Sequence, residues 1–377
     1  MKPLPRLSLA ARLGSVAVLL SIAAQAAGAA EPSPRKPSAK RPTTHAKTAA
    51  AHRKPAQHKV AKPPAQRPAV GPYAEREDVR EFVRMMSERH GFDASALGAT
   101  FARVQRIPDV LKLISPPAPT FKRSWEAYRA RFLDPLRIRE GLRFWRDHEA
   151  ALQRAQETWR VPPEIVVAII GVETIYGRMT GDFRIIEALS TLAFDYPRRA
   201  AFFREELEQY LLYARAEGID AFDVRGSFAG AIGLPQFMPG SIRRYAIDFD
   251  GDGRIDLRAS PVDAVGSVAR FLAEHGWVGG EPTHFGVSIG DPARLPALIE
   301  AGIEPRFTAG ELADLAVTSP DPIRPGTLLA LVDLPNADKP PTYLLGARNF
   351  YVITRYNRSS FYAMAVIELA QVLANAR

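Results

Sequence analysis

The 377-residue sequence contains no cysteine, and this absence excludes two kinds of covalent anchoring. No disulfide can brace the fold, and no N-terminal cysteine can carry a lipid. An exported domain of this size must instead rely on its core, or on a metal bound through oxygen or histidine ligands. The apolar content of 46% is sufficient for a substantial core.

The apolar run near the N-terminus, residues 13–24, is too short to span a bilayer comfortably. It follows Lys2, Arg6 and Arg12 and precedes the small residues AQA and AGA, which is the pattern of a secretory signal peptide. We therefore interpret residues 1–30 as a signal peptide, with an uncleaved anchor as the alternative. The mature protein is expected to be periplasmic and to have no transmembrane segment.

Residues 31–72 lack aromatic side chains and contain one acid, Glu31, against ten lysines and arginines. With nine prolines as well, this stretch cannot bury enough apolar surface to fold, so we expect an extended linker. It either attaches to an anionic envelope surface or serves as a solvated spacer. Because residues 73–377 carry a small net negative charge, nucleic-acid binding is not expected.

The remaining chain, residues 73–377, has mostly helical patterning. Apolar residues recur at three- and four-residue spacing from Glu75 to Trp277, with a break at Asp134 and Pro135. Two later stretches, residues 326–334 and 341–357, are rich in β-branched and aromatic residues and predict strands, and a last helix follows them. The sequence therefore predicts a mainly α (α+β) domain with a small β insertion at about residues 326–357.

An acid ends the most apolar stretch, VPPEIVVAIIGVETIYGRMTG (residues 161–181). Two prolines favour a helix start there and Gly177 favours its end, so Glu173 is expected near the end of a buried helix. Desolvation and the negative end of the helix dipole both favour a neutral carboxyl group, which is what a general acid for a glycosidic oxygen requires. The alternative is an ordinary glutamate at a frayed helix end, in water or paired with Arg178 or Arg184.

A second candidate segment is GSFAGAIGLPQFMPGSI (residues 226–242), which is too rich in glycine for an ordinary helix. Such backbone can approach a ligand closely, and Ser227 and Gln236 could then hydrogen-bond a polyhydroxylated substrate. A tight turn between helices is the alternative interpretation.

Together with VETIYG, ALSTLAFDYPRRAAFF (residues 188–203) and RYNRSSFYA (residues 355–363), this segment resembles the lytic murein transglycosylases of the B type. The resemblance extends in order over essentially all of residues 73–377. It implies a lysozyme-like helical catalytic core that cleaves peptidoglycan at the β-1,4 bond between N-acetylmuramic acid and N-acetylglucosamine. The reaction is non-hydrolytic and leaves 1,6-anhydromuramoyl ends.

The resemblance also implies roles for single residues. Glu173 matches the family's single catalytic acid/base, and Ser227 matches the position that hydrogen-bonds this acid. The positions that line the sugar cleft match Gln236, Tyr356, Asn357 and Tyr362. Glycan strands are the implied substrate, enzymes of cell-wall synthesis or remodelling are candidate partners, and no organic cofactor is expected.

The matched motifs offer no obvious second carboxylate. Ordinary retaining or inverting glycosidases need one as nucleophile or base, whereas in the lytic reaction the C6 hydroxyl of the sugar attacks C1. One alternative is a hydrolytic muramidase in which Asp182 or Asp195 activates water. Another is a non-catalytic, peptidoglycan-binding or calcium-dependent scaffold protein.

A separate motif, DFDGDGRIDL (residues 248–257), predicts a calcium site. Asp248, Asp250 and Asp252 stand at alternate positions as in an EF-hand loop, and Arg254 would add its backbone carbonyl. We expect this EF-hand-like loop to brace the structure without touching the sugar.

The closing ligand of this loop is less regular, because position twelve is Ala259 instead of glutamate. As in the longer calcium loop of the B-type family, we expect Asp263 to close the site. The local alternative is that Ser260, Pro261 and Asp263 form the start of a helix.

Overall fold

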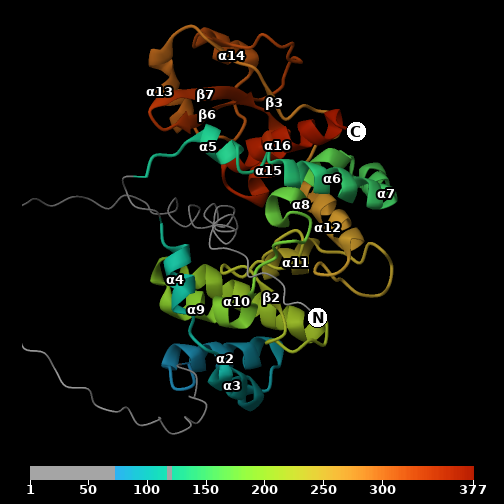
Figure 1. The fold of residues 1–377 in the computed structure, drawn as a ribbon. Helices are drawn as coiled ribbons and strands as arrows, with labels where there is room; N and C mark the ends of the chain where they lie inside the picture. The colour runs from blue at the N-terminus through green and yellow to red at the C-terminus, as the bar shows by residue number, and fades with distance from the viewer. Residues whose placement is uncertain (1–72, 117–120) are drawn as a thin grey trace, which may run out of the picture.

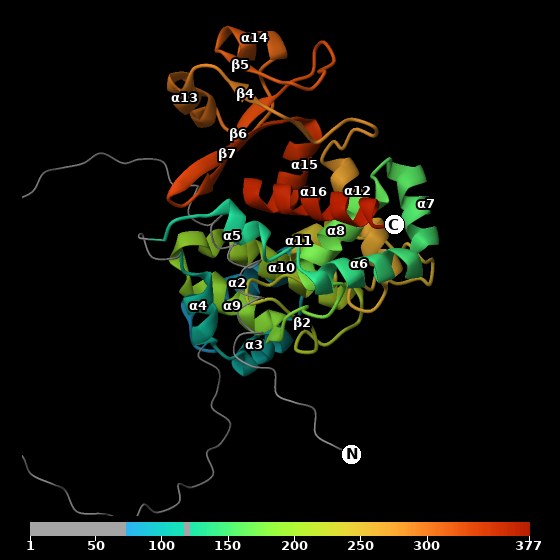
Figure 2. The ribbon, with the colours of Figure 1, turned by 45° about the horizontal axis from the view of Figure 1, so that its top comes forward.

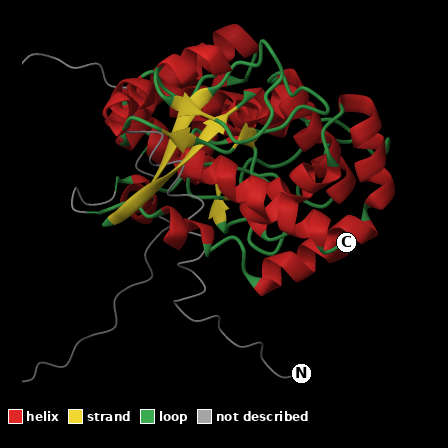
Figure 3. Ribbon diagram, turned by 90° about the horizontal axis from the view of Figure 1, so that it is seen from above, coloured by secondary structure: helices red, strands yellow, loops and turns green. Residues whose placement is uncertain are grey.

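The computed structural model describes residues 73–116 and 121–377, so the predicted signal peptide (residues 1–30) and linker (residues 31–72) lie outside the described residues. The described chain is mainly helical with few strands (Figure 3), as the sequence predicts. Within these two ranges, no helix combines the length and the apolar character needed to cross a membrane.

The first helices pack against a helical pair from the middle of the chain (Figure 1). Phe194 joins them, since the rings of Phe82 and Phe101 meet its ring edge-on, with centroids at 5.9 and 6.2 Å. This group consists of α2 (Glu77–His90), α3 (Ala94–Arg103), α4 (Pro108–Ile114), α9 (Ile185–Asp195), the short 3-10 helix η1 (Pro197–Arg199) and α10 (Ala200–Ala216).

Helix α8 (Pro163–Thr174) lies at the centre of the second group of helices (Figures 1 and 2). All of its residues except Glu164 and Glu173 are buried, because α6, α7, α12 and α16 surround it. The predicted all-apolar helix is therefore confirmed. The other helices of this group are α5 (Trp125–Arg129), α6 (Pro135–Asp147), α7 (Glu149–Trp159), α11 (Pro239–Tyr245), α12 (Pro261–Glu274), α15 (Arg348–Tyr356) and α16 (Ser360–Asn375).

The helix boundaries agree with the sequence signals at most positions. Asp134 caps the start of α6 by accepting a hydrogen bond from the Arg137 N–H, which confirms the predicted break. The end of α8 was predicted from Gly177 and is wrong by a few residues. The helix ends at Thr174, and the two residues that follow it, Ile175 and Tyr176, are already left-handed.

A small antiparallel sheet covers one end of the molecule (Figure 2). Strand β6 (Ala330–Asn336) pairs with β7 (Lys339–Gly346) in the register Val332 to Leu344, and β3 (His284–Phe285) pairs with the other edge of β7. A second apolar cluster lies under this sheet. The same region contains η2 (Pro292–Arg294), α13 (Leu295–Glu300), α14 (Ala309–Asp314) and the paired strands β4 (Ser288–Ile289) and β5 (Val317–Thr318). A separate two-stranded pair is formed by β1 (Phe183–Arg184) and β2 (Arg225–Gly226).

The prediction of one strand over residues 341–357 is wrong in its second half. Strand β7 ends at Gly346, and residues 348–356 form helix α15. Phe350 and Ile353 are fully buried on one face of this helix, which packs against α16 and α12. Local preference of aromatic and β-branched residues for strands is weak, and burial against these helices overrides it.

Candidate active site

Glu173 is the next-to-last residue of α8 and is partly exposed, whereas every other residue of this helix except Glu164 is buried. Its Oε1 accepts a hydrogen bond of 2.7 Å from the Tyr362 hydroxyl. Burial raises the pKa of Glu173 to about 8, and the Tyr362 hydrogen bond opposes this rise in part. Among the hydrogen bonds of the described residues none engages Oε2, so this oxygen can carry a proton and deliver it.

Tyr362 and Tyr356 come from different helices and stack beside the acid. Their ring centroids lie 6.2 Å apart at an angle of 11°. Tyr362 in α16 is fully buried, whereas Tyr356 at the end of α15 is partly exposed and donates its hydroxyl to the Pro235 carbonyl at 2.5 Å. Asn357 follows directly and is 4% exposed. The structure thus places Tyr362 at Glu173 and Tyr356 at the loop around Pro235, two of the predicted cleft residues.

Ser227 lies in the loop between β2 and α11, and its contacts differ from those that the family resemblance implies. Its Oγ accepts a hydrogen bond from the Ala231 N–H at 2.9 Å, and its own N–H donates to the Ala231 carbonyl at 2.9 Å. The loop closes on itself through these bonds. Within the described residues, the hydroxyl that reaches Glu173 is therefore that of Tyr362 and not that of Ser227.

Gln236 is 9% exposed and lies in the same loop with a left-handed φ of 50°. Its Nε2 donates to the carbonyls of Thr180 and Gly233 at 3.1 and 3.0 Å. The glycines of this loop serve close packing within the protein. A Cβ on Gly230 or Gly233 would lie 2.3 Å from Leu189 or the Leu257 carbonyl oxygen, respectively.

The motifs do not single out Arg137 of α6, although it is 6% exposed and lies beside α8. Its Nε donates to the Gly171 carbonyl of α8 at 2.8 Å, and its Nη1 donates to the Arg131 carbonyl at 2.7 Å and pairs with Asp134. A cation here stabilises the negative end of the α8 dipole. An arginine on the apolar face of a predicted helix is the signal that could have identified it.

The two aspartates considered as a second carboxylate lie in different environments. Asp195 is held by the Tyr73 hydroxyl at 2.7 Å and by Arg76 at 2.6 Å, so it anchors the start of the described chain. Asp182 is exposed. Among the contacts of the described residues, neither aspartate reaches Glu173 or Tyr362, so neither geometry supports a base that activates water beside the acid.

The three aspartates of the predicted calcium loop converge. One carboxylate oxygen each from Asp248, Asp250 and Asp252 lies within 4.8 Å of the others. Asp248 also accepts hydrogen bonds from the N–H groups of Gly251 and Gly253 at 2.7 and 2.8 Å, which curls the loop around its carboxylate. Oxygen donors in this arrangement suit a hard cation such as calcium.

Asp263 lies outside this group of converging oxygens, although it contacts the same loop. It is 1% exposed, and its carboxylate accepts hydrogen bonds from the N–H groups of Phe249 at 2.7 Å and Asp256 at 2.8 Å. Ser260 caps α12 by accepting from the Asp263 N–H at 3.1 Å, as the helix-start interpretation predicts. Asp263 thus joins the two ends of the loop.

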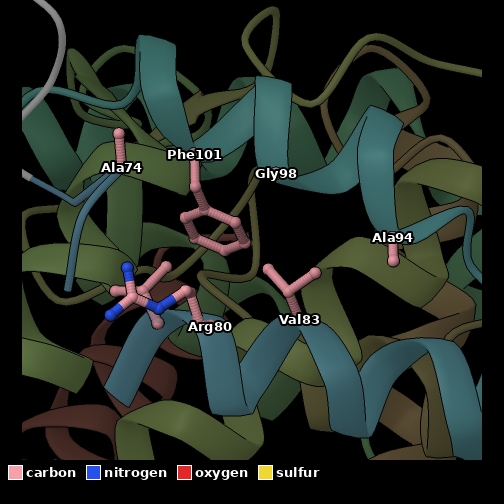
Figure 4. A pocket seen from close by; sticks show the side chains of 7 residues that line it. Ala74, Arg80, Val83, Ala94, Gly98 and Phe101 are labelled. Carbon is pink, nitrogen blue, oxygen red and sulfur yellow. The ribbon is translucent and has the colours of Figure 1, made fainter. Parts of the chain in front are cut away.

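Two hollows of the described chain lie apart from Glu173. One, of about 160 Å³, opens between α2 and α3 (Figure 4), and the other, of about 590 Å³, runs along α6. The first is lined by Ala74, Val79, Arg80, Val83, Ala94, Gly98 and Phe101, and the second by Pro135, Ile138, Arg139, Leu142, Arg143 and Arg146. Neither lining includes a predicted site residue.

Comparison with known proteins shows which class of protein has this fold. Residues 74–371 match the transglycosylase SLT domain, so the chain belongs to this family. Among its relatives, the membrane-bound lytic murein transglycosylase B of Escherichia coli (strain K12) is 42% identical over 315 residues, which cover 81% of this chain and 85% of the relative.

Solved structures of lytic transglycosylases share the fold. The soluble lytic transglycosylase SltB1 from Pseudomonas aeruginosa is 46% identical with a TM-score of 0.74, and the match covers 80% of this chain and 99% of SltB1. The Escherichia coli lytic transglycosylase Slt35 in complex with calcium is 41% identical with a TM-score of 0.73, over 82% of this chain and 96% of Slt35. The predicted family and the mainly helical fold are thereby confirmed.

Proposed function

We propose that this protein is a peptidoglycan lytic transglycosylase that cleaves the β-1,4 bond between N-acetylmuramic acid and N-acetylglucosamine. Glu173 is its single acid/base. The observation that carries this proposal is the setting of Glu173, whose raised pKa keeps it protonated near neutral pH while Tyr362 fixes one of its oxygens. Family membership supports the reaction class, because the named relatives are lytic murein transglycosylases.

The reaction balances without water. Glu173 first donates its proton to the glycosidic oxygen, so that the bond from this oxygen to C1 of the muramoyl residue breaks and the N-acetylglucosamine hydroxyl leaves. The C6 hydroxyl of the same muramoyl residue then attacks C1, and the Glu173 carboxylate accepts the hydroxyl proton. The product has a 1,6-anhydro ring, and the acid is regenerated. Because the nucleophile is already part of the substrate, positioning supplies much of the rate.

The cleft residues would provide this positioning. Tyr362 holds the acid, and the partly exposed ring of Tyr356 offers an aromatic face to a sugar. Gln236 uses its amide hydrogens on backbone carbonyls, so its Oε1 is the atom suited to accept from a sugar hydroxyl. We assign Ser227 and Asn357 to the same cleft through the family match, with Ser227 shaping the loop.

The test is the product that the purified protein releases from sacculi. We expect muropeptides lighter by one water than hydrolytic products, and a loss of turnover of about a thousandfold or more in Glu173→Gln, because the substituted amide cannot donate a proton. Glu164→Gln, the same change at the other end of α8, is the matched control and should retain activity. Hydrolytic products would favour a muramidase, and undiminished turnover by Glu173→Gln would refute the acid/base assignment.

We further propose that the loop at residues 248–263 binds calcium. Asp248, Asp250 and Asp252 would hold the ion with the Arg254 carbonyl, and Asp263 would close the site after exchanging its backbone hydrogen bonds for the metal. The converging oxygens support this assignment, as does the calcium complex of Slt35. The ion would brace the loop between α11 and α12, and no step of the reaction passes through it.

The proposed domain organisation follows from the sequence. Residues 1–30 direct export to the periplasm, residues 31–72 form a basic linker, and residues 73–377 are the catalytic domain. Peptidoglycan strands are the substrate partner, and enzymes of cell-wall synthesis or remodelling are candidate protein partners.

A further inference from the structure

The turn that follows Glu173 has a strained backbone. Ile175 and Tyr176 have φ values of 49° and 56°, a left-handed conformation that is unfavourable for a β-branched or bulky residue. Such residues persist only where surrounding contacts over-determine them. The contacts that hold this left-handed turn in place begin at Thr174, one residue after Glu173.

Thr174 is fully buried, and its hydroxyl joins three parts of the site. Oγ1 donates to the Leu234 carbonyl at 2.9 Å and accepts from the Gly177 N–H at 3.0 Å. The first bond ties the end of α8 to the glycine-rich loop, and the second closes the left-handed turn. A single hydroxyl therefore connects the end of α8, the left-handed turn and the glycine-rich loop that contains Leu234, which we call the cleft loop.

Tyr176 fixes the same turn from the other side. A Cβ on either Gly141 or Gly171 would lie 2.3 Å from the Tyr176 hydroxyl oxygen, so the ring fills a space that only these glycines leave. It also packs on Phe144, with ring centroids 5.3 Å apart. The ring prevents the turn from relaxing towards α6.

The loop that Thr174 holds is itself fixed. Tyr356 binds the Pro235 carbonyl, and Gln236 binds the Thr180 carbonyl just beyond the turn. Thr174 is thus bound to a rigid partner, and loss of its hydroxyl bond would free the end of α8 from the loop.

We propose that Thr174 is a positioning residue for the acid. By binding the Leu234 carbonyl it fixes the direction in which Glu173 presents its carboxyl group, with Oε1 at Tyr362 and Oε2 towards the substrate. The inference rests on the proposed function of Glu173. Without the Thr174 hydroxyl, the strained turn relaxes, the carboxyl group leaves Tyr362, and water reaches it.

Thr174→Val tests this role, because valine keeps the shape and removes the hydroxyl. Thr174→Ser keeps the hydroxyl and should therefore keep the activity that Thr174→Val loses. Thr191→Val is the matched control, since Thr191 is also fully buried and its hydroxyl also joins distant segments, accepting from the Ile107 N–H at 3.0 Å.

We expect kcat on soluble glycan fragments to fall about tenfold to a hundredfold in Thr174→Val, with KM changed less than about twofold. Thr174→Ser should stay within about twofold of wild type, and Thr191→Val should lose thermal stability without losing kcat. A Thr174→Val enzyme with wild-type kcat, or a Thr191→Val enzyme with the same loss, would overturn the assignment.

The pKa of Glu173 distinguishes a positioning role of Thr174 from a role in the stability of the fold alone. The pKa of Glu173, followed by NMR of its carboxyl carbon, should fall in Thr174→Val, because the gain of water outweighs the loss of the Tyr362 hydrogen bond, which is the smaller of the two effects on this pKa. The alkaline limb of the rate profile should move to lower pH with it. An unchanged pKa contradicts the proposal. Because this measurement does not depend on turnover, it decides the point even if the wild-type enzyme released no anhydro product, a result that would refute the proposed function instead.

If Thr174→Val does not fold, Thr174→Cys is measured instead. It keeps the size and a weaker donor, and the chain has no other cysteine to pair with it. A smaller loss of kcat and a smaller fall in the pKa of Glu173 are then expected. Wild-type values of both would overturn the proposal.

Discussion

At Glu173, burial and hydrogen bonding act on the pKa in opposite directions. Burial raises it to about 8, and the hydroxyl of Tyr362 lowers it in part. The side chain must be protonated to donate, so we expect kcat to fall as the pH rises through this value. The same raised pKa makes the acid a cost to stability once it ionises.

This cost predicts how stability depends on pH. Between the ordinary glutamate pKa near 4.5 and about 8, the folded protein keeps the Glu173 proton while the unfolded chain loses it, so wild type loses stability as the pH rises. Glu173→Gln does not titrate. Its melting temperature should therefore exceed that of wild type by about 2–5 °C at pH 8, and by much less at pH 5. Scanning calorimetry at both pH values measures the difference. Glu164→Gln should show no such trend, and a constant gain in Glu173→Gln would contradict the shift.

The residues at this site could be predicted only in part. A lone acid at the end of an apolar run makes Glu173 a candidate, and the family resemblance assigns it the acid/base role and adds Tyr356 and Tyr362 from the RYNRSSFY stretch. Which hydroxyl reaches the acid depends on how α16 packs against α8, a long-range contact without a local signal. Thr174 has no sequence signal of its own, because its role depends on the Leu234 carbonyl, sixty residues away in the chain.

At the scale of elements, local signals succeed where capping or an unbroken apolar pattern determines the structure. Asp134 starts α6 and the apolar run forms α8, both as expected. Local signals fail where packing against other elements determines the structure. Residues 348–356 have the composition of a strand but become helical against α16 and α12, and α8 ends at Thr174, before Gly177.

The acidic loop is the element whose behaviour should depend most on solution conditions. If calcium binds Asp248, Asp250 and Asp252, an ion at about a hundred times its dissociation constant adds about 2.7 kcal/mol to the free energy of unfolding. Chelation should then lower the melting temperature by about 5 °C. In the double variant Asp250→Asn/Asp252→Asn the chelator should have no effect.

Asp314→Asn provides the control for this experiment, since Asp314 is exposed at the end of α14. It should respond to the chelator as wild type does. A wild-type protein whose melting temperature is the same with calcium and with chelator would refute the calcium site.

At the scale of the whole molecule, charge is distributed unevenly along the sequence. Residues 31–72 contain most of the excess lysine and arginine, whereas residues 73–377 are slightly acidic. We expect deletion of residues 31–72 to leave turnover of soluble glycan fragments within about twofold of wild type and to weaken adsorption to anionic sacculi, most strongly at low salt. Pelleting assays over a salt series measure the adsorption.

A chain of equal length with the ten basic residues of this linker replaced by serine separates charge from length. It should adsorb as weakly as the deletion does. If either variant lost turnover of soluble fragments, the view of residues 31–72 as a linker would be wrong.

The three hydrogen bonds that hold the cleft loop share one property, which is that none of them involves a charged group. Thr174, Tyr356 and Gln236 all use uncharged donors on backbone carbonyls. Dissolved ions screen interactions between charges and leave such bonds nearly unaffected. We therefore expect the loop around Pro235 to keep its position over a wide range of salt concentrations, whereas any adsorption that depends on the basic residues 31–72 should weaken as the salt concentration rises.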